Sequence, residues 1–333
     1  MSWLWPGRRA RRVLVMMLAS VAVALAIGAI WQASAVRRER AQFPPPGKLV
    51  DVRGRRLHYV CIGSGEPTVI FESSGFGSAL SAEKARTEIS QRTRVCSYDR
   101  MGMGWSDPGP SVISAGLLAD DLAHLLAAAD IKPPYILVPS SIGGLTSEVF
   151  ARRHPRDVAG LVFLDAAQSE GAADLSSRVG TIGRTAMAAA ACVPKFAAAV
   201  GLLRLIDPMS LRHQQGGDRG VAVLYRTEPM RTMCGIVRGW DATMREFAST
   251  PPLRADVPLV VLTAETTENL APAKLAWLLG SSITRDRIAI QQRFAKRSTR
   301  GTWQLVPGSD HLIASSQPRA VAAAVLNLIS RLH

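Results

Sequence analysis

Short apolar segments alternate with helical segments along most of this chain, and this alternation limits the possible folds more than any other feature. The apolar runs are brief and bounded by turn residues, which is typical of strands buried on both faces of a sheet. The sequence therefore predicts an α/β fold, a mostly parallel sheet flanked by helices. The predicted strands are 48–52, 55–62, 67–72, 93–98, 135–138, 159–164, 258–263 and 302–306, and the predicted helices include 114–130, 141–153 and 317–332.

One long segment breaks this alternation. Residues 168–255 are rich in Ala, Leu and Arg and indicate several helices without a clear strand. An all-helical insertion between two strands is expected to lie as a cap over the carboxyl edge of the sheet, where sites in such folds form. We therefore predict a core of residues 47–167 and 256–333 and a helical cap of residues 168–255.

Residues 13–31 form an apolar run without a charged side chain. A helix of this length spans roughly 28 Å, close to the hydrocarbon thickness of a bilayer. We predict that residues 1–35 are a single transmembrane anchor and residues 36–46 a linker, with the catalytic domain on the extracytoplasmic side because slightly more arginines precede the run than follow it. Cleavage as a signal peptide near Ala35, which would release a secreted or periplasmic protein, remains the alternative.

The net charge of +14 first suggests nucleic acid as a partner, but its distribution argues against one. Residues 1–46 contain seven Arg and one Glu, and no zinc-finger, RNP-type or basic-zipper pattern accompanies the charge. Anionic lipid at the N-terminal helix explains the basic N-terminus more simply. The expected partners are therefore membrane lipid, through that helix, and a small-molecule substrate.

The four cysteines contain no CxxC pair, which argues against a structural zinc site. We expect no metal and no organic cofactor. Cys61 and Cys96 fall on predicted strands and are interpreted as buried packing residues. Cys192 and Cys234 both fall in the predicted cap, and we put forward their pairing in an oxidising compartment as a hypothesis.

A candidate nucleophile lies where residues 135–145 run from strand through a sharp turn into a helix. Such a turn exposes its side chain and needs small residues around it. If Ser141 is the nucleophile, Gly143 and Gly144 occupy the crowded positions after it, whereas Ser140 would place Ile142 there. Sterics thus favour Ser141, with simple N-capping of the helix as the structural alternative.

At this point the sequence resembles the α/β-hydrolase superfamily, and within it the serine esterase and haloperoxidase-like branch with a helical cap. The resemblance covers nearly all of residues 47–333. At the elbow the sequence departs from the family's G-x-S-x-G, with Pro139 in place of the first Gly and Ser140 in place of the usual His. Four segments carry the resemblance in the family's order: Glu72-Ser-Ser-Gly-Phe-Gly77, Ser97-Tyr-Asp-Arg-Met-Gly-Met-Gly-Trp-Ser-Asp107, Pro139-Ser-Ser-Ile-Gly143 and Gly308-Ser-Asp-His311.

A serine nucleophile needs a base and a carboxylate that orients it. His311 follows a strand in a loop that returns to the nucleophile's edge of the sheet, so we predict it as the general base. Family order places the acid after either of two strands. Asp165, which ends the run GLVFLD, is favoured, and Glu268 and Glu265 remain alternatives.

The resemblance also implies an oxyanion hole made by the backbone amides of Phe76 and Ile142. The function expected is hydrolysis of a small-molecule ester or related acyl bond through an acyl-enzyme. Serine rather than aspartate at the elbow argues against dehalogenase or epoxide-hydrolase chemistry. A non-catalytic ligand-binding protein of the same fold, and a cofactor-free lyase or perhydrolase on the same triad, remain alternatives.

Overall fold

The computed structural model describes residues 8–213, 217–266 and 286–332, and it confirms the α/β fold. The strands form one eight-stranded sheet in the order β1-β2-β4-β3-β5-β6-β7-β8. The pairs β1–β2 and β2–β4 are antiparallel, and all other pairs are parallel. The strands are β1 (Lys48–Val52), β2 (Arg55–Ile62), β3 (Thr68–Glu72), β4 (Val95–Tyr98), β5 (Tyr135–Pro139), β6 (Val158–Leu164), β7 (Leu259–Ala264) and β8 (Gly301–Val306).

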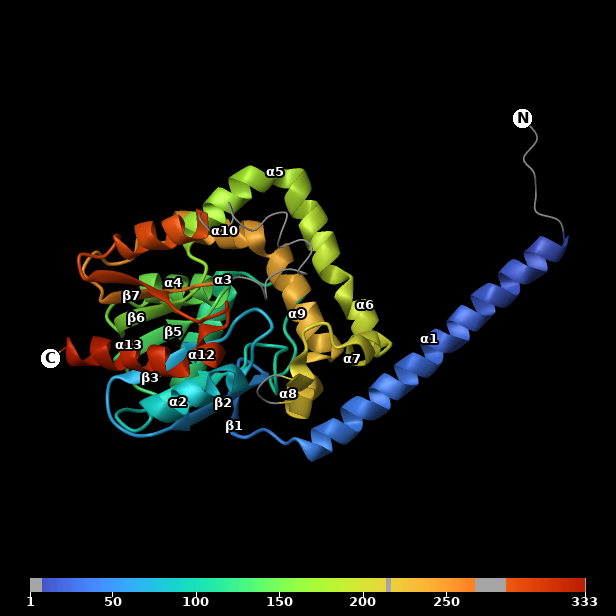
Figure 1. Cartoon of the computed structure of the whole chain (residues 1–333), viewed down its shortest axis with the longest axis horizontal. Coiled ribbons are helices and arrows are strands. Elements are labelled where there is room, and N and C mark those ends of the chain that lie inside the picture. The colour runs from blue at the N-terminus through green and yellow to red at the C-terminus, as the bar shows by residue number, and fades with distance from the viewer. Residues whose placement is uncertain (1–7, 214–216, 267–285, 333) are drawn as a thin grey trace.

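Helices cover both faces of the sheet, as Figure 1 shows. On one face α2 (Glu83–Ile89), α12 (Ile313–Ser316) and α13 (Pro318–Ser330) pack over a core that includes Val138, Val162 and Val325. On the other face α3 (Ala115–Ala128), α4 (Gly143–Arg153) and the helix over 286–295 pack over Leu122, Phe150 and Phe163. These two apolar layers hold the carboxyl ends of β5 and β6 in place, where the candidate site lies.

The cap segment between β6 and β7 contains only helices in the part that the structure describes. It comprises α5 (Ser169–Cys192), α6 (Pro194–Ala199), α7 (Leu202–Ile206), α8 (Gly217–Leu224), α9 (Thr227–Arg238) and α10 (Trp240–Ser249), with a short 3₁₀ turn at Leu211–His213. α5 is kinked at Gly180, whose φ of 64° lies in the left-handed region. The cap has an apolar cluster of its own, against which Phe76, Leu80 and Trp105 of the core pack.

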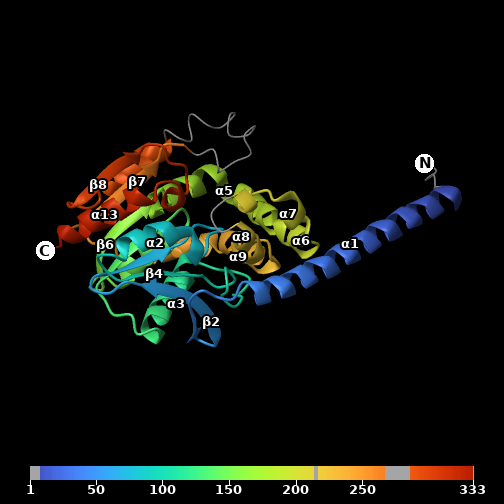
Figure 2. The same cartoon turned by 60° about the horizontal axis from the view of Figure 1, so that its bottom comes forward.

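α1 (Arg8–Gln42) is a single helix of 35 residues that projects from the body of the molecule (Figures 1 and 2). Its most apolar 18-residue window has a mean hydropathy of 2.7, and none of that window is buried against the protein. The helix continues through most of the segment predicted as a linker. Residues 36–42 consist largely of good helix formers, and no helix breaker occurs before Pro44.

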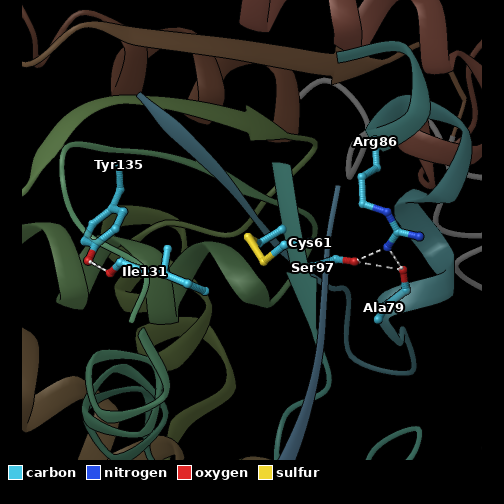
Figure 3. Close-up of a disulfide and its surroundings, with 7 residues drawn as sticks. Cys61, Ala79, Arg86, Ser97, Ile131 and Tyr135 are labelled. Atoms are coloured by element: carbon cyan, nitrogen blue, oxygen red, sulfur yellow. Dashed lines mark hydrogen bonds between the residues drawn. A yellow bond between two sulfur atoms is a disulfide. The ribbon is translucent and has the colours of Figure 1, made fainter. Parts of the chain in front are cut away.

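The interpretation of Cys61 and Cys96 as buried packing residues missed their bond, because the two are joined by a disulfide (Figure 3). They are direct partners in the antiparallel register of β2 and β4. The chain places β3 between these two strands in sequence, so their adjacency in the sheet could not be predicted from sequence order. The hypothesis for the cap is confirmed, since Cys192 and Cys234 form a second disulfide, between the end of α5 and α9.

Candidate active site

Ser141 lies on the turn between β5 and α4, and its φ of 52° is in the left-handed region. Non-glycine residues adopt this conformation at a cost of about 1–3 kcal/mol, so the surrounding structure must hold it. The Ser140 N–H donates to the Glu72 carbonyl (3.0 Å), and the Ala167 N–H donates to the Ser141 carbonyl (2.8 Å). The turn is thereby fixed to the end of β3 and to the segment that follows β6.

The two glycines after Ser141 lie where any side chain would collide with backbone. A Cβ at Gly143 would come within 2.6 Å of the Ser73 carbonyl oxygen, and one at Gly144 within 2.0 Å of the Ala167 carbonyl oxygen. The steric argument that favours Ser141 over Ser140 therefore matches the crowding in the structure. Pro139 is the last residue of β5, where it pairs with Glu72 of β3.

His311 bridges Ser141 and Asp165 in one hydrogen-bonded chain. Its Nε2 lies 2.8 Å from Ser141 Oγ, and its Nδ1 lies 2.7 Å from Asp165 Oδ2. A carboxylate only accepts hydrogen bonds, so Nδ1 carries the donated proton and Nε2 is free to accept the serine hydroxyl. His311 and Asp165 are buried, with 9% and 3% of their surfaces exposed, so water competes little for these contacts.

The second oxygen of Asp165 is held by residues that the sequence reasoning did not identify. Gln291 Nε2 donates to Oδ1 at 2.9 Å, and Arg287 Nη1 contacts the same oxygen. Burial alone would raise the pKa of Asp165, but the hydrogen bond from His311 and the charge of Arg287 outweigh it and hold that pKa below its ordinary value. The only sequence signal was their i, i+4 spacing, which puts both side chains on one helix face.

The alternative acids do not contact His311 in the part of the chain that the structure describes. Glu265 Oε2 instead accepts the N–H of Gly308 at 2.7 Å, which ties the end of β7 to the loop before His311. Glu268 lies outside the described residues. Asp310, the neighbour of His311, accepts the N–H of Leu312 (2.9 Å).

The amides of Phe76 and Ile142 make no hydrogen bond to any other residue described here. The segments that carry them lie side by side, since a Cβ at Gly75 would be 3.6 Å from Ile142 Cγ2. Met233 of α9 covers the same point, with its Cε 3.0 Å from that Cβ position. Two unpartnered N–H donors thus lie near Ser141, covered by the apolar side chain of Met233.

Comparison with known proteins identifies the family of this chain. The sequence pattern described as "Alpha/beta hydrolase family" matches residues 57–324. The chain belongs to the alpha/beta hydrolase family. Hydrolases of this fold carry their nucleophile on a strand–turn–helix elbow like the one at Ser141.

Several curated relatives align with parts of this chain. An uncharacterized protein of Schizosaccharomyces pombe, C23C11.06c, is 53% identical over 23% of this chain and 15% of its own length. YbdG of Bacillus subtilis, also uncharacterized, is 28% identical over 39% of this chain and 41% of its own length. A haloalkane dehalogenase of Sphingobium indicum is 28% identical over 36% of this chain and 41% of its own length. The chain thus spans less than half the length of each of these relatives.

Solved structures share the fold across most of the chain. An esterase from Thermogutta terrifontis has a TM-score of 0.57 at 18% identity, covering 86% of this chain and 98% of its own. An enol-lactonase from Burkholderia xenovorans has a TM-score of 0.57 at 19% identity, covering 85% of this chain and 100% of its own. A putative epoxide hydrolase from Pseudomonas aeruginosa has a TM-score of 0.64 at 16% identity, covering 86% of this chain and 95% of its own. At these identities the likeness concerns the fold.

A buried cluster of Glu72, Tyr98 and Arg100 lies beneath the loop that carries Phe76. Arg100 Nε is 3.0 Å from Glu72 Oε1, and Arg100 Nη2 donates to the carbonyl of Ser73 at 2.6 Å and also contacts that of Ser74. The Tyr98 hydroxyl donates to the other Glu72 oxygen. Burial raises the pKa of Glu72 to about 7, against the opposing effect of the Arg100 charge.

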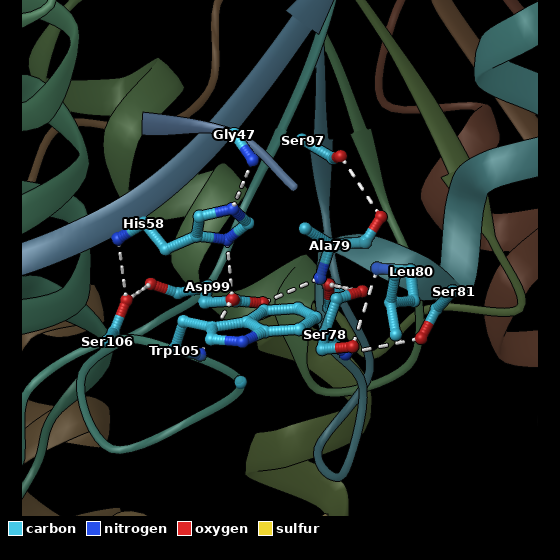
Figure 4. Close-up of polar contacts among 12 residues, drawn as sticks. Gly47, His58, Ser78, Ala79, Leu80, Ser81, Ser97, Asp99, Trp105 and Ser106 are labelled. Carbon is cyan, nitrogen blue, oxygen red and sulfur yellow. Dashed lines mark hydrogen bonds and ion pairs between the residues drawn. The ribbon is translucent and has the colours of Figure 1, made fainter. Parts of the chain in front are cut away.

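His58 anchors a second network, which fixes the loop after β4 and the segment after β3 (Figure 4). Its Nε2 accepts the Gly47 N–H (3.1 Å), so Nδ1 carries the proton and donates to Asp99 (2.7 Å). Asp99 also accepts the N–H groups of Ala79 (2.7 Å) and Trp105 (3.1 Å). These contacts give His58 a structural role.

Proposed function

We propose that this protein is a membrane-anchored serine hydrolase that cleaves a small-molecule ester or related acyl bond. The observation that carries the proposal is the continuous contact from Ser141 Oγ through His311 to Asp165, with Ser141 held on a left-handed turn. This order of hydroxyl, imidazole and carboxylate is what activates a serine at neutral pH.

The mechanism follows from these contacts. The Ser141 hydroxyl attacks the acyl carbon and passes its proton to His311 Nε2. The imidazolium formed there is stabilised by the Asp165 carboxylate, which Arg287 and Gln291 hold in its ionised form and in position. His311 then returns the proton to the departing alcohol. A water molecule attacks the acyl-enzyme by the same route and releases the acid.

The free amides of Phe76 and Ile142 support the oxyanion hole of this proposal. Negative charge develops on the carbonyl oxygen during each attack, and preorganised N–H donors stabilise it. An apolar cover such as Met233 strengthens that stabilisation, because it excludes water from the site.

The nucleophile favours acyl chemistry over the other reactions named among the relatives and structural neighbours. Ester and lactone bonds are acyl bonds that a serine alkoxide attacks to form an acyl-enzyme. Epoxide and haloalkane chemistry proceeds through an aspartate ester that water can cleave, and Ser141 stands at the position where that aspartate is required. We therefore favour a carboxylic ester as the substrate class.

We further propose that α1 crosses the membrane and that the hydrolase domain lies on the extracytoplasmic side. The length and hydropathy of α1 fit a bilayer span. The two disulfides favour an oxidising compartment, because cytosolic thiols are kept reduced.

Labelling of full-length protein in membranes with a fluorophosphonate probe tests the hydrolase assignment. Wild-type protein and Ser140→Ala should be labelled, whereas Ser141→Ala should not. Absence of labelling in folded wild-type protein would support a ligand-binding protein instead. Labelling accompanied by turnover of cyanohydrins or peroxide, but not of any acyl ester, would support a lyase or perhydrolase.

A further inference from the structure

Exposed apolar side chains concentrate on one part of the cap. We consider the exposed large apolar side chains that the structure describes outside α1. Only two of them, Leu49 and Val112, belong to the hydrolase core. Phe196 and Leu205 are each 66% exposed, an unusual state for side chains of this size. Apart from Leu49 and Val112, all exposed large apolar side chains described outside α1, including these two, lie between residues 175 and 206. We call Val193, Phe196, Leu202, Leu205 and Ile206 the α6–α7 face.

This face lies beside the apolar run of α1. A Cβ at Gly28 would come within 2.6 Å of the Val200 carbonyl oxygen, and one at Gly201 within 2.6 Å of the Trp31 ring. Figure 2 shows α6 and α7 alongside α1. Gly28 lies inside the apolar run, about 4.5 Å along the helix from Trp31. The turn between α6 and α7 is therefore level with the end of the predicted span.

Polar contacts between α1 and the cap begin immediately beyond Trp31. Gln32 Nε2 donates to the Tyr225 carbonyl at 2.9 Å, and Gln32 Oε1 accepts Arg204 Nε at 2.9 Å. Arg204 also forms an ion pair with Glu39, about 10 Å farther along the helix. Contacts along α1 thus change from apolar to polar in the order expected for a helix that leaves a bilayer.

We propose that the α6–α7 face lies in the outer leaflet of the same bilayer that α1 crosses, and that the ester substrate is an amphiphile taken from that leaflet. The proposal rests on the proposed function for the anchor and for the hydrolysis. Lipid is the occupant because the face is continuous with the apolar surface of α1 and lies level with its end. An interfacial position also suits apolar side chains on short helices that no other part of the described chain covers.

The interior of the cap links this face to the candidate active site. Ala198 of α6 and Leu203 of α7 belong to one apolar cluster with Tyr225 and Met230, and Phe76 packs against that cluster. Phe76 carries a proposed oxyanion donor, and the Cys192–Cys234 disulfide ties the start of this region to α9 above the site. An acyl chain entering between the leaflet and Ser141 would meet apolar side chains, which favours long-chain esters over small polar ones.

Depth measurements on the full chain test the location of the face. Single cysteines at Phe196→Cys and Leu205→Cys, labelled with an environment-sensitive fluorophore, are compared with Val112→Cys in phosphatidylcholine vesicles. All four native cysteines are disulfide-bonded, so labelling without reductant is specific. We expect spin-labelled lipid to quench the two cap positions several-fold more than position 112, and iodide to show the reverse order.

Two outcomes overturn the location. If iodide reaches positions 196 and 205 as freely as position 112, the face lies in water. If neither iodide nor spin-labelled lipid quenches them, a second copy of the chain covers the face instead.

Rates on two substrates test the source of the ester. The ratio of the rate on a long-chain ester in vesicles to the rate on a soluble short-chain ester should fall at least several-fold in Phe196→Glu/Leu205→Glu and stay unchanged in Val112→Glu. An unchanged ratio in the cap variant overturns membrane uptake. Absence of turnover on both substrates in wild-type protein would instead contradict the proposed hydrolase, while the depth measurement would still decide the location of the face.

Discussion

The Arg100 guanidinium lies between Glu72 Oε1, 3.0 Å from its Nε, and the Ser73 carbonyl, 2.6 Å from its Nη2. One buried cation thus neutralises a buried carboxylate and holds the backbone that leads to Phe76. Arg100 thereby ties two carbonyls of the loop that carries Phe76, in addition to the bonds from the Ser73 hydroxyl to the Ser78 carbonyl and from the Ala79 N–H to Asp99.

Arg100→Met should destabilise the fold and lower turnover. At a pH well above the pKa of Glu72, removing one partner of this buried ion pair leaves an uncompensated charge, which costs about 3–5 kcal/mol. The double variant Glu72→Gln/Arg100→Met should lose much less than the sum of the two single variants, because no charge is left behind. Chemical denaturation measures the losses of stability and steady-state kinetics the loss of turnover, and strictly additive stability losses would contradict the pairing.

Glu72 should make stability depend on pH between its ordinary pKa of 4.5 and its folded-state pKa of about 7. In that range the folded state binds more protons than the unfolded state, so stability falls as pH rises, by up to about 3 kcal/mol. Thermal melts at pH 5 and pH 8 should show this loss in wild-type protein and much less of it in Glu72→Gln. The exposed Glu83→Gln serves as control and should behave like wild type.

Asp165→Asn should reduce kcat by a factor on the order of 10³–10⁴, since the imidazole then loses its orienting charge. Glu265→Gln and Glu268→Gln, which replace the alternative acids, should retain most of the activity. Steady-state kinetics on a soluble ester checks all three. A loss in Glu268→Gln comparable with that in Asp165→Asn would move the acid to the other strand.

Arg287→Gln should move the acid limit of stability and activity to higher pH. The lowered pKa of Asp165 provides stability above its unfolded-state value of 3.8 that disappears as pH falls through the folded-state value. Without the Arg287 charge the folded-state pKa rises, so protonation of Asp165 begins at a higher pH. Arg293→Gln, on the same helix, is the matched control. Identical acid limbs in both variants would show that Arg287 does not act on Asp165.

The turn at Ser141 follows from local sequence, whereas Asp165 and His311 were placed by the order of segments in the family that the chain resembles; the structure brings the three side chains into contact. Ser141 is favoured by Gly143 and Gly144, Asp165 follows β6 directly, and His311 lies in the loop after β8. The sequence could not show which strands are neighbours in the sheet, or which face of each helix packs against it. The Cys61–Cys96 bond requires β2 beside β4, and the contacts of Arg287 and Gln291 require knowing which helix face meets β6. The short helix α2 was also not predicted, since its seven residues give too little periodicity.

The two disulfides should contribute separately to stability and to the site. The Cys61–Cys96 bond closes a separation of 35 residues within the core, so Cys61→Ala/Cys96→Ala should cost about 2–4 kcal/mol of unfolding free energy with little change in KM. Cys192→Ala/Cys234→Ala releases α5 from α9, which carries Met233 over the oxyanion donors, so we expect a raised KM for long-chain esters. Denaturation and steady-state kinetics on both variants separate the two effects. Equal KM changes in the two variants would mean that the cap disulfide has no particular role in substrate binding.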